Sequence, residues 1–192
     1  MRISGGAARG VTLSVPKGDS VRPATDGLRQ AVFSSLAMRV PGSIFLDLFA
    51  GSGAYGLEAL SRGAAGGIFI EKNARTVSCL RQNITAVCKS LRRDQSELKV
   101  LQGDVLEWTL NALEVVPDLV FVDPPYELIE ETAPKIFERL GKLLIPERDP
   151  VVVFEMPGEI TLNIEGWTCV KRLGGGTRQP TAAFFKASQA TT

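Results

Sequence analysis

The sequence contains no histidine. Without an imidazole, the chain cannot build Ser–His–Asp catalysis, Cys–His catalysis or the usual zinc sites. Carboxylates are therefore the polar catalytic groups to expect. We expect no metal, and a reaction that needs little acid–base help.

Cysteines are few, and long apolar runs are missing. The three cysteines, Cys79, Cys88 and Cys169, form no Cys-x-x-Cys pair, so no disulfide framework is expected. No stretch approaches the roughly 18 apolar residues of a membrane span. The first six residues also lack the apolar segment of a secretion signal. These absences favour a cytoplasmic protein outside the membrane, and nothing in the sequence demands more than a monomer.

Positive charge is concentrated near the N-terminus. Residues 1–39 contain six basic side chains and two acidic ones, whereas the whole chain has a formal net charge of +1. A basic segment beside a near-neutral remainder favours a polyanionic partner on that side.

Short apolar segments alternate with helical patterns from residue 43 onward. Strands of the kind that is buried on both faces of a parallel sheet are predicted at 44–48, 67–70, 98–101, 119–122 and 151–154. Helices are predicted at 73–92 and at about 132–144, the second with Pro134 in its first turn. This order predicts an α/β fold, a doubly wound sheet with helices on both faces.

The two ends of the chain have a different pattern. Alternating apolar residues at 11–15, together with segment 3–6, predict a β-hairpin arm over residues 1–18, which leaves 19–192 as one domain. A helix capped by Thr25 or Asp26 should follow. Near the C-terminus, segments 160–164, 168–173 and 181–185 predict strands that close one sheet edge, and we expect a disordered tail from about residue 187.

A glycine-rich loop follows the first predicted strand. Segment 47–56 reads Asp-Leu-Phe-Ala-Gly-Ser-Gly-Ala-Tyr-Gly, and Glu71 ends the next strand, 20 residues after Gly51. Glycines let a ligand approach the backbone, and the following helix N-terminus offers free N–H groups. The pattern fits the dinucleotide fingerprint, and by itself it does not separate NAD from S-adenosylmethionine.

Two acidic residues favour S-adenosylmethionine. Asp47 suits a ligand with an ammonium group and would repel a pyrophosphate, and Asp104 after the third strand can contact an adenine amine. Each also has a structural interpretation, Asp104 as a helix cap and Asp47 as an organiser of the loop. The predicted cofactor-binding residues are Asp47, Phe49, Ala50, Gly51, Ser52, Gly53, Gly56, Glu71, Lys72, Asp104, Val105 and Asp123.

The fourth predicted strand stops at Asp123-Pro124-Pro125-Tyr126. Neither proline can donate a backbone hydrogen bond, so a central strand must end there. The segment has the parts that hold a planar ring with an exocyclic amine. Asp123 and a proline carbonyl can accept the amine hydrogens while Tyr126 stacks on the ring. The structural alternative is a strand that simply ends at proline and a turn.

Taken in order, Asp47, the glycine loop, Glu71, Asp104 and residues 123–126 resemble the class I S-adenosylmethionine-dependent methyltransferases. The N-terminal segments 2–10 and 22–29 narrow this resemblance to the bacterial small-subunit ribosomal RNA guanine-N2 methyltransferases. The resemblance runs from the first residue to about residue 126 and is loose beyond it.

The resemblance implies a Rossmann-like seven-stranded sheet with an N-terminal β-hairpin, and a guanine in an assembling small ribosomal subunit as substrate. It implies that Glu71 binds the ribose, that Asp104 binds the adenine, and that Asp123 to Tyr126 bind the target base. The chain departs from the family pattern at Ala24, Gly27, Gln30, Glu127, Glu130 and Glu131.

We expect direct methyl transfer from S-adenosylmethionine to an exocyclic amine that is held by Asp123 and the Pro124 carbonyl. RNA phosphates are expected to contact four basic residues, Arg2, Arg9, Arg22 and Arg29. One alternative is a DNA adenine-N6 methyltransferase, which uses the same tetrapeptide but usually needs an additional recognition segment. Another is a non-catalytic RNA-binding assembly protein on the same fold.

Overall fold

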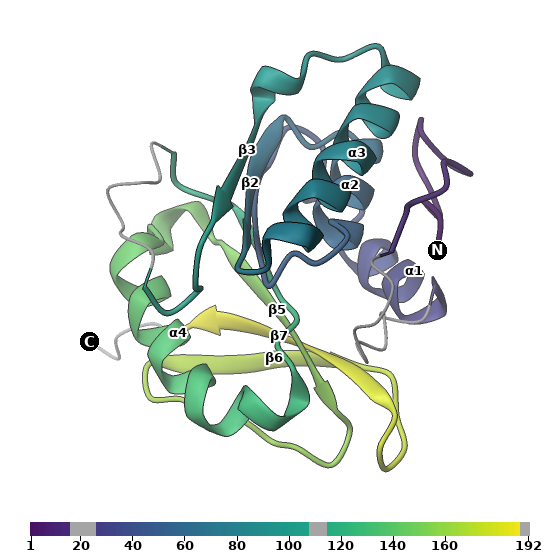
Figure 1. Ribbon diagram of the computed structural model, residues 1–192. Helices are drawn as coiled ribbons and strands as arrows, with labels where there is room; N and C mark the ends of the chain where they lie inside the picture. Colours follow the sequence, from purple (N-terminus) through teal and green to yellow (C-terminus); the bar gives the residue numbers. More distant parts are fainter. Residues whose placement is uncertain (16–25, 108–114, 189–192) are drawn as a thin grey trace.

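The computed structural model describes residues 1–15, 26–107 and 115–188 (Figure 1). Within these residues, seven strands form one mixed sheet in the order β3-β2-β1-β4-β5-β7-β6. They are β1 (Ile44–Leu48), β2 (Gly66–Glu71), β3 (Leu98–Gln102), β4 (Leu119–Val122), β5 (Val151–Pro157), β6 (Trp167–Leu173) and β7 (Pro180–Ala187). Strands β1 to β5 are parallel, and β7 is antiparallel to both β5 and β6. The predicted α/β fold with a seven-stranded sheet is confirmed.

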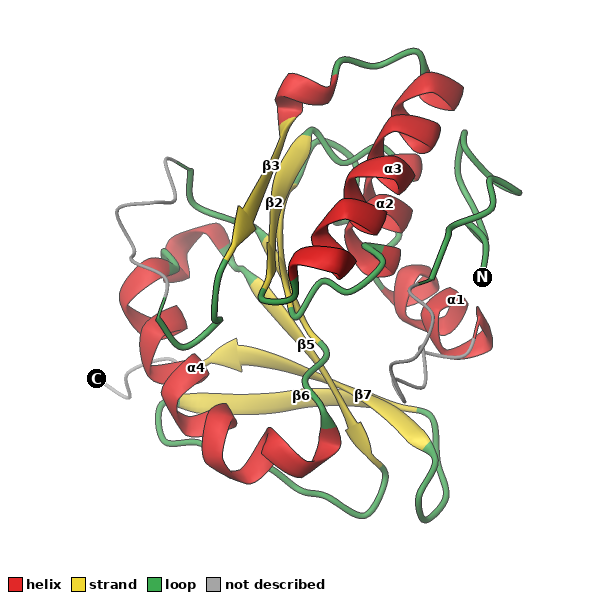
Figure 2. Cartoon of the chain, viewed as in Figure 1, coloured by secondary structure: helices red, strands yellow, loops and turns green. Residues whose placement is uncertain are grey.

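Helices cover both faces of this sheet. Helices α1 (Asp26–Ser35), α2 (Ala54–Ser61) and α3 (Ala74–Leu91) lie on one face, and α4 (Ile129–Leu143) lies on the other (Figures 1 and 2). Successive strand residues point to opposite faces, so Phe45 and Phe121 enter the core beneath α1–α3 whereas Leu46 and Val122 enter the core beneath α4. Within the described residues, no helix is both long and apolar enough to cross a membrane.

Strand β1 lies at the point where the strand order reverses. The chain passes from β1 outward to β2 and β3, and then returns to β4 on the other side of β1. In doubly wound sheets, ligands bind beyond the carboxyl ends of the strands at such a switch point. The glycine loop leaves β1 there and the Asp-Pro-Pro-Tyr segment leaves β4, so the fold brings the two predicted motifs to one edge.

The N-terminal segment folds back on itself and packs against the domain. Arg2 and Thr12 form an isolated antiparallel bridge, and the Ile3 N–H donates to the Val11 carbonyl at 2.9 Å. Its apolar side chains Ile3, Ala8 and Leu13 are buried in the core beneath α1–α3. The described part of the predicted arm, residues 1–15, is therefore a closely packed loop with little strand structure.

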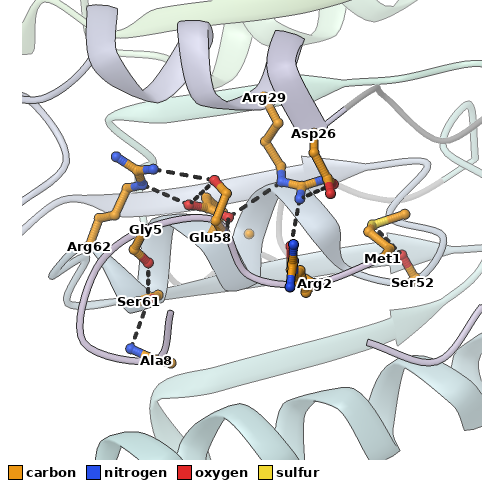
Figure 3. Close-up of polar contacts among 12 residues, drawn as sticks. Met1, Arg2, Gly5, Ala8, Asp26, Arg29, Ser52, Glu58, Ser61 and Arg62 are labelled. Atoms are coloured by element: carbon orange, nitrogen blue, oxygen red, sulfur yellow. Dashed lines mark hydrogen bonds and ion pairs between the residues drawn. The ribbon is translucent and has the colours of Figure 1, made fainter. Parts of the chain in front are cut away.

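Backbone contacts with α2 hold this segment in place. Gly6 has a φ of +77°, and a Cβ there would lie 2.0 Å from the Ser61 carbonyl oxygen. The Ala7 N–H donates to that carbonyl at 2.8 Å. The Ser61 hydroxyl donates to the Gly5 carbonyl at 2.6 Å and accepts from the Ala8 N–H at 2.9 Å (Figure 3).

The start of α4 differs from the prediction. Pro134 lies in the second turn of α4 because the helix begins at Ile129, directly after a 3-10 turn at Tyr126–Leu128. Pro134 is exposed, so solvent can satisfy the carbonyl that loses a partner. Asp26 is the first residue of α1, while Thr25 lies outside the described residues.

Two C-terminal predictions also need correction. Residues 160–164 form no strand, and β7 pairs directly with β5 on one edge and β6 on the other. Arg172 Nη2 instead donates to the Gly158 and Ile160 carbonyls at 3.1 and 3.0 Å. Ala187 is the last residue of β7, and the Ser188 N–H donates to the Gly166 carbonyl at 2.8 Å. The remainder of the predicted disordered tail lies outside the described residues.

Candidate functional site

The glycine loop turns sharply over the carboxyl ends of β1 and β2. Phe49, Gly51 and Gly53 have positive φ angles of 57°, 55° and 81°. The Ala50 N–H donates to the Ile70 carbonyl at 3.0 Å, which fixes the loop beside the end of β2. Ser52 is buried, and Gly53 after it is the N-cap residue of α2.

The three glycines of the fingerprint have different roles. A Cβ on Gly56 would lie 2.4 Å from the Phe69 ring and 2.5 Å from the Phe45 ring, so this glycine lets α2 pack closely on the sheet. A Cβ on Gly53 would lie 2.4 Å from the Leu80 side chain. At Gly51 the nearest atom to a Cβ would be the Phe49 carbonyl oxygen, 3.8 Å away. Gly51 therefore borders the open space in which a ligand can approach the backbone.

Glu71 organises the same loop from β2. Its Oε2 accepts from the Gly51 N–H at 2.9 Å and its Oε1 accepts from the Asn73 N–H at 2.8 Å. Each carboxylate oxygen retains a further lone pair. Two fixed oxygens beside an open glycine are the acceptors that ribose hydroxyls require, so the predicted ribose contact fits this geometry.

Asp104 lies two residues beyond Gln102, the last residue of β3, and Gln102 pairs with Glu71 of β2. The Gly103 N–H donates to the Glu71 carbonyl at 3.0 Å, which joins the ends of β2 and β3. Asp104 Oδ2 accepts from Lys72 Nζ at 2.7 Å, and Oδ1 accepts from the Leu106 N–H at 2.9 Å. These hydrogen bonds, that of Lys72 first, lower the pKa of Asp104 and keep it ionised. Val105 is buried behind it.

Asp47 is enclosed beneath the loop. Its Oδ2 accepts from the Gly56 N–H at 2.9 Å, and only 2% of the residue is exposed. Burial raises the pKa of Asp47 to about 8, an effect that the Gly56 hydrogen bond opposes and the charge of Glu71 increases. The observed contact is that of a loop organiser.

The Asp-Pro-Pro-Tyr segment continues directly from β4. The Asp123 N–H donates to the Leu48 carbonyl at 3.4 Å, so the Asp123 backbone lies beside the start of the glycine loop. Pro124 is buried, and the exposed Pro125 caps the 3-10 turn that contains Tyr126. The Leu128 N–H donates to the Pro125 carbonyl at 2.9 Å. Because the turn uses the Pro125 carbonyl, the Pro124 carbonyl is the better candidate acceptor for an amine.

A second buried acid, which the sequence analysis missed, lies next to Asp123. Glu155 follows Phe154 on β5, and Phe154 is in register with Val122 on β4. Burial raises the pKa of Asp123 well above its usual range, and the charges of Glu155 and Asp47 raise it further. A single acid at the end of an apolar strand, the same signal that identified Glu71, could have indicated Glu155.

The four predicted RNA-contacting arginines are not equivalent. Arg2 and Arg9 are exposed, and Arg22 lies outside the described residues. Arg29 is fully buried, so the prediction that it contacts phosphates is wrong. Its Nη2 donates to the Arg2 carbonyl at 2.7 Å and to Asp26 at 2.8 Å, and its Nε lies 3.4 Å from Glu58 Oε2 (Figure 3). Arg29 is a structural cation that joins α1, α2 and the N-terminal segment.

Comparison with known proteins places this geometry in context. Residues 1–182 match the family profile described as "Conserved hypothetical protein 95". Over 134 residues the chain is 38% identical to "Ribosomal RNA small subunit methyltransferase D" of Escherichia coli (strain K12). That match covers 69% of this chain but 64% of the relative, so it spans less than two thirds of the relative's length.

Solved structures share the whole fold. A hypothetical protein of Thermus thermophilus is 29% identical with a TM-score of 0.75, and the match covers 98% of this chain and 99% of that one. The rRNA methyltransferase aviRa of Streptomyces viridochromogenes is 16% identical with a TM-score of 0.66, over 94% and 91% of the two chains. The second likeness, at this low identity, shows that the two chains share a fold.

Proposed function

Because this chain belongs to the family described as conserved hypothetical protein 95, we propose that it methylates the N2 amine of a guanine in small-subunit ribosomal RNA. The methyl donor is S-adenosylmethionine. The Escherichia coli relative is named as a small-subunit ribosomal RNA methyltransferase. The resemblance of this sequence to guanine-N2 methyltransferases supports guanine N2 as the methylated position.

One observation carries this proposal. The carboxylate expected to hold the target amine and the loop expected to hold the cofactor meet at the ends of β4 and β1, where the Asp123 N–H donates to the Leu48 carbonyl. Methyl transfer requires donor and acceptor in line within a few ångströms. The adjacency of the two segments at the switch point of the sheet supports this requirement.

The cofactor side of the site combines the open face of Gly51, the two fixed oxygens of Glu71 and the ionised Asp104. In this arrangement Glu71 binds the ribose hydroxyls and Asp104 binds the adenine amine. When bound, S-adenosylmethionine supplies a methyl group on a positively charged sulfur. Asp47 supports this side indirectly, because it fixes the Gly56 end of the loop.

The substrate side uses Asp123 and the Pro124 carbonyl as acceptors for the two amine hydrogens, with Tyr126 against the base. The lone pair of an exocyclic amine is delocalised into the ring, so the amine is a weak nucleophile. Hydrogen bonds to fixed acceptors favour a pyramidal nitrogen and direct its lone pair. As positive charge develops on the nitrogen, the Asp123 carboxylate stabilises it.

A base must leave its stack to reach such an edge, and RNA offers unpaired bases in loops. The exposed Arg2 and Arg9 side chains are suited to the phosphates around that base. We take the partner to be small-subunit ribosomal RNA within an assembling subunit, and the enzyme to act as a cytoplasmic monomer.

The test is transfer of labelled methyl from S-adenosylmethionine to undermethylated small ribosomal subunits, with duplex DNA in parallel, followed by nucleoside analysis. The proposal predicts label in N2-methylguanosine of the RNA. Label confined to N6-methyladenine of DNA would show that the substrate is DNA, and the proposed role of Asp123 would still hold. Binding of RNA without any binding of S-adenosylmethionine would instead favour a non-catalytic assembly protein.

A further inference from the structure

Glu155 is the acid that the proposed reaction leaves unexplained. It lies on β5, one residue beyond the pair Val122–Phe154, and Asp123 lies one residue beyond the same pair on β4. Residues two positions earlier, Phe121 and Val153, point into the core beneath α1–α3. Because side chains alternate along a strand, Glu155 continues the same face, directly beside the end of β4.

Tyr55 of α2 makes a hydrogen bond to the Glu155 side chain. The Tyr55 ring stacks on Phe121, with centroids 5.2 Å apart and an interplanar angle of 19°. Its hydroxyl donates to Glu155 Oε2 at 2.7 Å. The stacked ring cannot swing away without disrupting the core, so it fixes one oxygen of Glu155 in position.

The other oxygen of Glu155 is buried and has no hydrogen-bond partner within the described residues. Glu155 as a whole is 1% exposed. An acid that only filled space would be replaced at lower cost by an apolar residue, because a buried polar atom without a partner is destabilising. The acidic form therefore points to a role that depends on charge.

The charged and titratable groups that interact with Glu155 are Asp123 beyond β4, Tyr55 on α2 and Arg29 on α1. Asp47 on β1 interacts with Asp123. No set of three His, Cys, Asp or Glu side chains in the described residues is arranged to hold a metal ion. The charge of Glu155 acts on the neighbouring Asp123, whose pKa it raises.

We propose that Glu155, fixed by Tyr55, is a positioning residue for methyl transfer whose negative charge makes the neighbouring Asp123 carboxylate a stronger proton acceptor. This inference rests on the proposed function, because it assigns Asp123 to the target amine. Burial raises the pKa of Asp123, and the charge of Glu155 raises it further. Burial also raises the pKa of Glu155 to about 7, which the Tyr55 hydrogen bond and then Arg29 oppose, so Glu155 ionises near neutral pH.

The step that benefits is the loss of a proton from the methylated amine. One N–H bond breaks, its electron pair returns to the nitrogen, and the proton binds a carboxylate oxygen of Asp123. Asp123 alone contacts the reacting group, whereas Glu155 acts through it. In a chain without histidine, a neighbouring negative charge is a direct way to strengthen a carboxylate base.

The first experiment measures single-turnover methylation of small-subunit RNA from pH 5 to pH 9. It compares the unaltered protein with Glu155→Gln, which retains an oxygen for the Tyr55 hydroxyl. We expect the acid limb of the Gln variant to move to lower pH by about one unit. Its plateau rate should fall about threefold, since proton transfer follows the basicity of the acceptor. An unmoved acid limb would overturn the proposal.

Two further variants make the result specific. Tyr55→Phe keeps the ring on Phe121 and removes the hydroxyl, so Glu155 should ionise less readily and the acid limb should move in the same direction. Glu138→Gln makes the same chemical change at an exposed position of α4, paired with Lys142, and should leave the profile unchanged. If Glu155→Gln does not fold, the profile of Tyr55→Phe decides the question.

A readout that needs neither RNA nor cofactor separates this inference from the proposed function. Titration of ¹³C-labelled aspartate carboxyls by NMR reports the pKa of Asp123, assigned by its loss in Asp123→Asn. A lower pKa of Asp123 in Glu155→Gln supports the coupling even if no RNA is methylated. The same pKa in both proteins, with methylation intact, would remove Glu155 from the mechanism and leave the proposed function standing.

Discussion

Arg29 and Glu58 form an ion pair in which both side chains are completely buried, with Nε 3.4 Å from Oε2. Glu58 also accepts from the Ser4 N–H at 2.8 Å and from Arg62 Nε at 2.8 Å (Figure 3). The pair therefore links α1 and α2 and attaches the N-terminal segment to both. A segment held in this way is part of the domain and presents its outer side chains from a fixed position.

Arg29→Met should destabilise the protein, and any effect on RNA recognition should follow only from the weaker attachment of the N-terminal segment. Removal of one member of a buried pair leaves the other charge uncompensated, so we expect a loss of about 3 kcal/mol in the free energy of unfolding. Urea denaturation measures this loss. The exposed Arg9→Ala should change stability by less than about 0.5 kcal/mol. If folded Arg29→Met lost RNA affinity but kept its stability, Arg29 would be an RNA-contacting residue after all.

The sequence analysis predicted that Arg29 contacts RNA because it considered only the positive charge. It did not consider which face of α1 the side chain lies on. Leu28, Val32 and Phe33 are buried on the inner face of α1, and Arg29 lies on that same face. Its partner Glu58 is 29 residues away, on an element that reaches α1 only in the folded chain. Nothing local in the sequence indicates such a pairing.

Arg2 and Arg9 remain the described arginines expected to contact phosphates. Their combined replacement by alanine should reduce the slope of log K against log salt by about 1.4, at roughly 0.7 for each single-stranded phosphate contact. Affinity for S-adenosylmethionine should not change. Filter binding across a salt series makes the measurement.

Lys135→Ala with Lys142→Ala is the matched control for this pair. It also removes two charges, from exposed side chains that form ion pairs within α4. An equal change of slope in this control would mean that only net charge matters, and would contradict a specific contact by Arg2 and Arg9.

Gly51 and Gly56 should respond differently to alanine. Gly51→Ala has space for its Cβ but must keep a φ of +55°, so it should lose about 1 kcal/mol of stability. Its Cβ would enter the space that borders the ligand, and we expect about a tenfold loss of S-adenosylmethionine affinity. Calorimetric titration measures that loss. Unchanged affinity would show that the cofactor does not approach this glycine.

Gly56→Ala provides the comparison. Its Cβ would collide with the Phe69 and Phe45 rings at 2.4 and 2.5 Å, and such overpacking costs about 1–3 kcal/mol. Thermal unfolding should show this loss. The folded fraction should still bind S-adenosylmethionine with near-normal affinity.

Stability should fall as the pH rises through the range in which Glu155 ionises. Its pKa rises from an ordinary 4.5 to about 7 in the folded protein. The folded state therefore holds the proton more tightly than the unfolded state, and this stabilisation is complete below pH 4.5 and lost by about pH 7. The corresponding free energy is roughly 3 kcal/mol.

Glu155→Gln removes this dependence, because an amide does not titrate. Urea denaturation at pH 5 and pH 8 should therefore show that the variant gains stability relative to the unaltered protein as the pH rises. A constant difference between the two proteins across this range would contradict the raised pKa of Glu155.

Periodicity was sufficient to predict the parallel part of the sheet. Strands β1 and β4 have the predicted limits, and β2, β3 and β5 extend by one to three residues, because strands buried on both faces are continuous apolar runs. Residues 160–164 misled the prediction, since their alternation arises from Ile160, Leu162 and Ile164, which pack against the core from a segment that is not a strand. Which strand edges are free depends on the order of the whole sheet, and a local pattern does not contain that information.

The motifs at the strand ends were predictable for the same reason. Glu71, Asp104 and Asp123 each follow a recognisable apolar strand, and parallel strands bring their carboxyl ends to one edge. Glu155 also follows an apolar strand, but its relation to Asp123 follows only from the pairing of β5 with β4.

The most direct test of the central claim is the single-turnover methylation rate of Asp123→Ala on undermethylated small-subunit RNA, measured at saturating S-adenosylmethionine. The account predicts a rate lower by about 10²–10³-fold, because a preorganised acceptor for the developing charge is lost. Affinity for S-adenosylmethionine should remain within a few-fold of normal. A near-normal rate would contradict the assignment of Asp123 to the target amine and, with it, the mechanism proposed for this site.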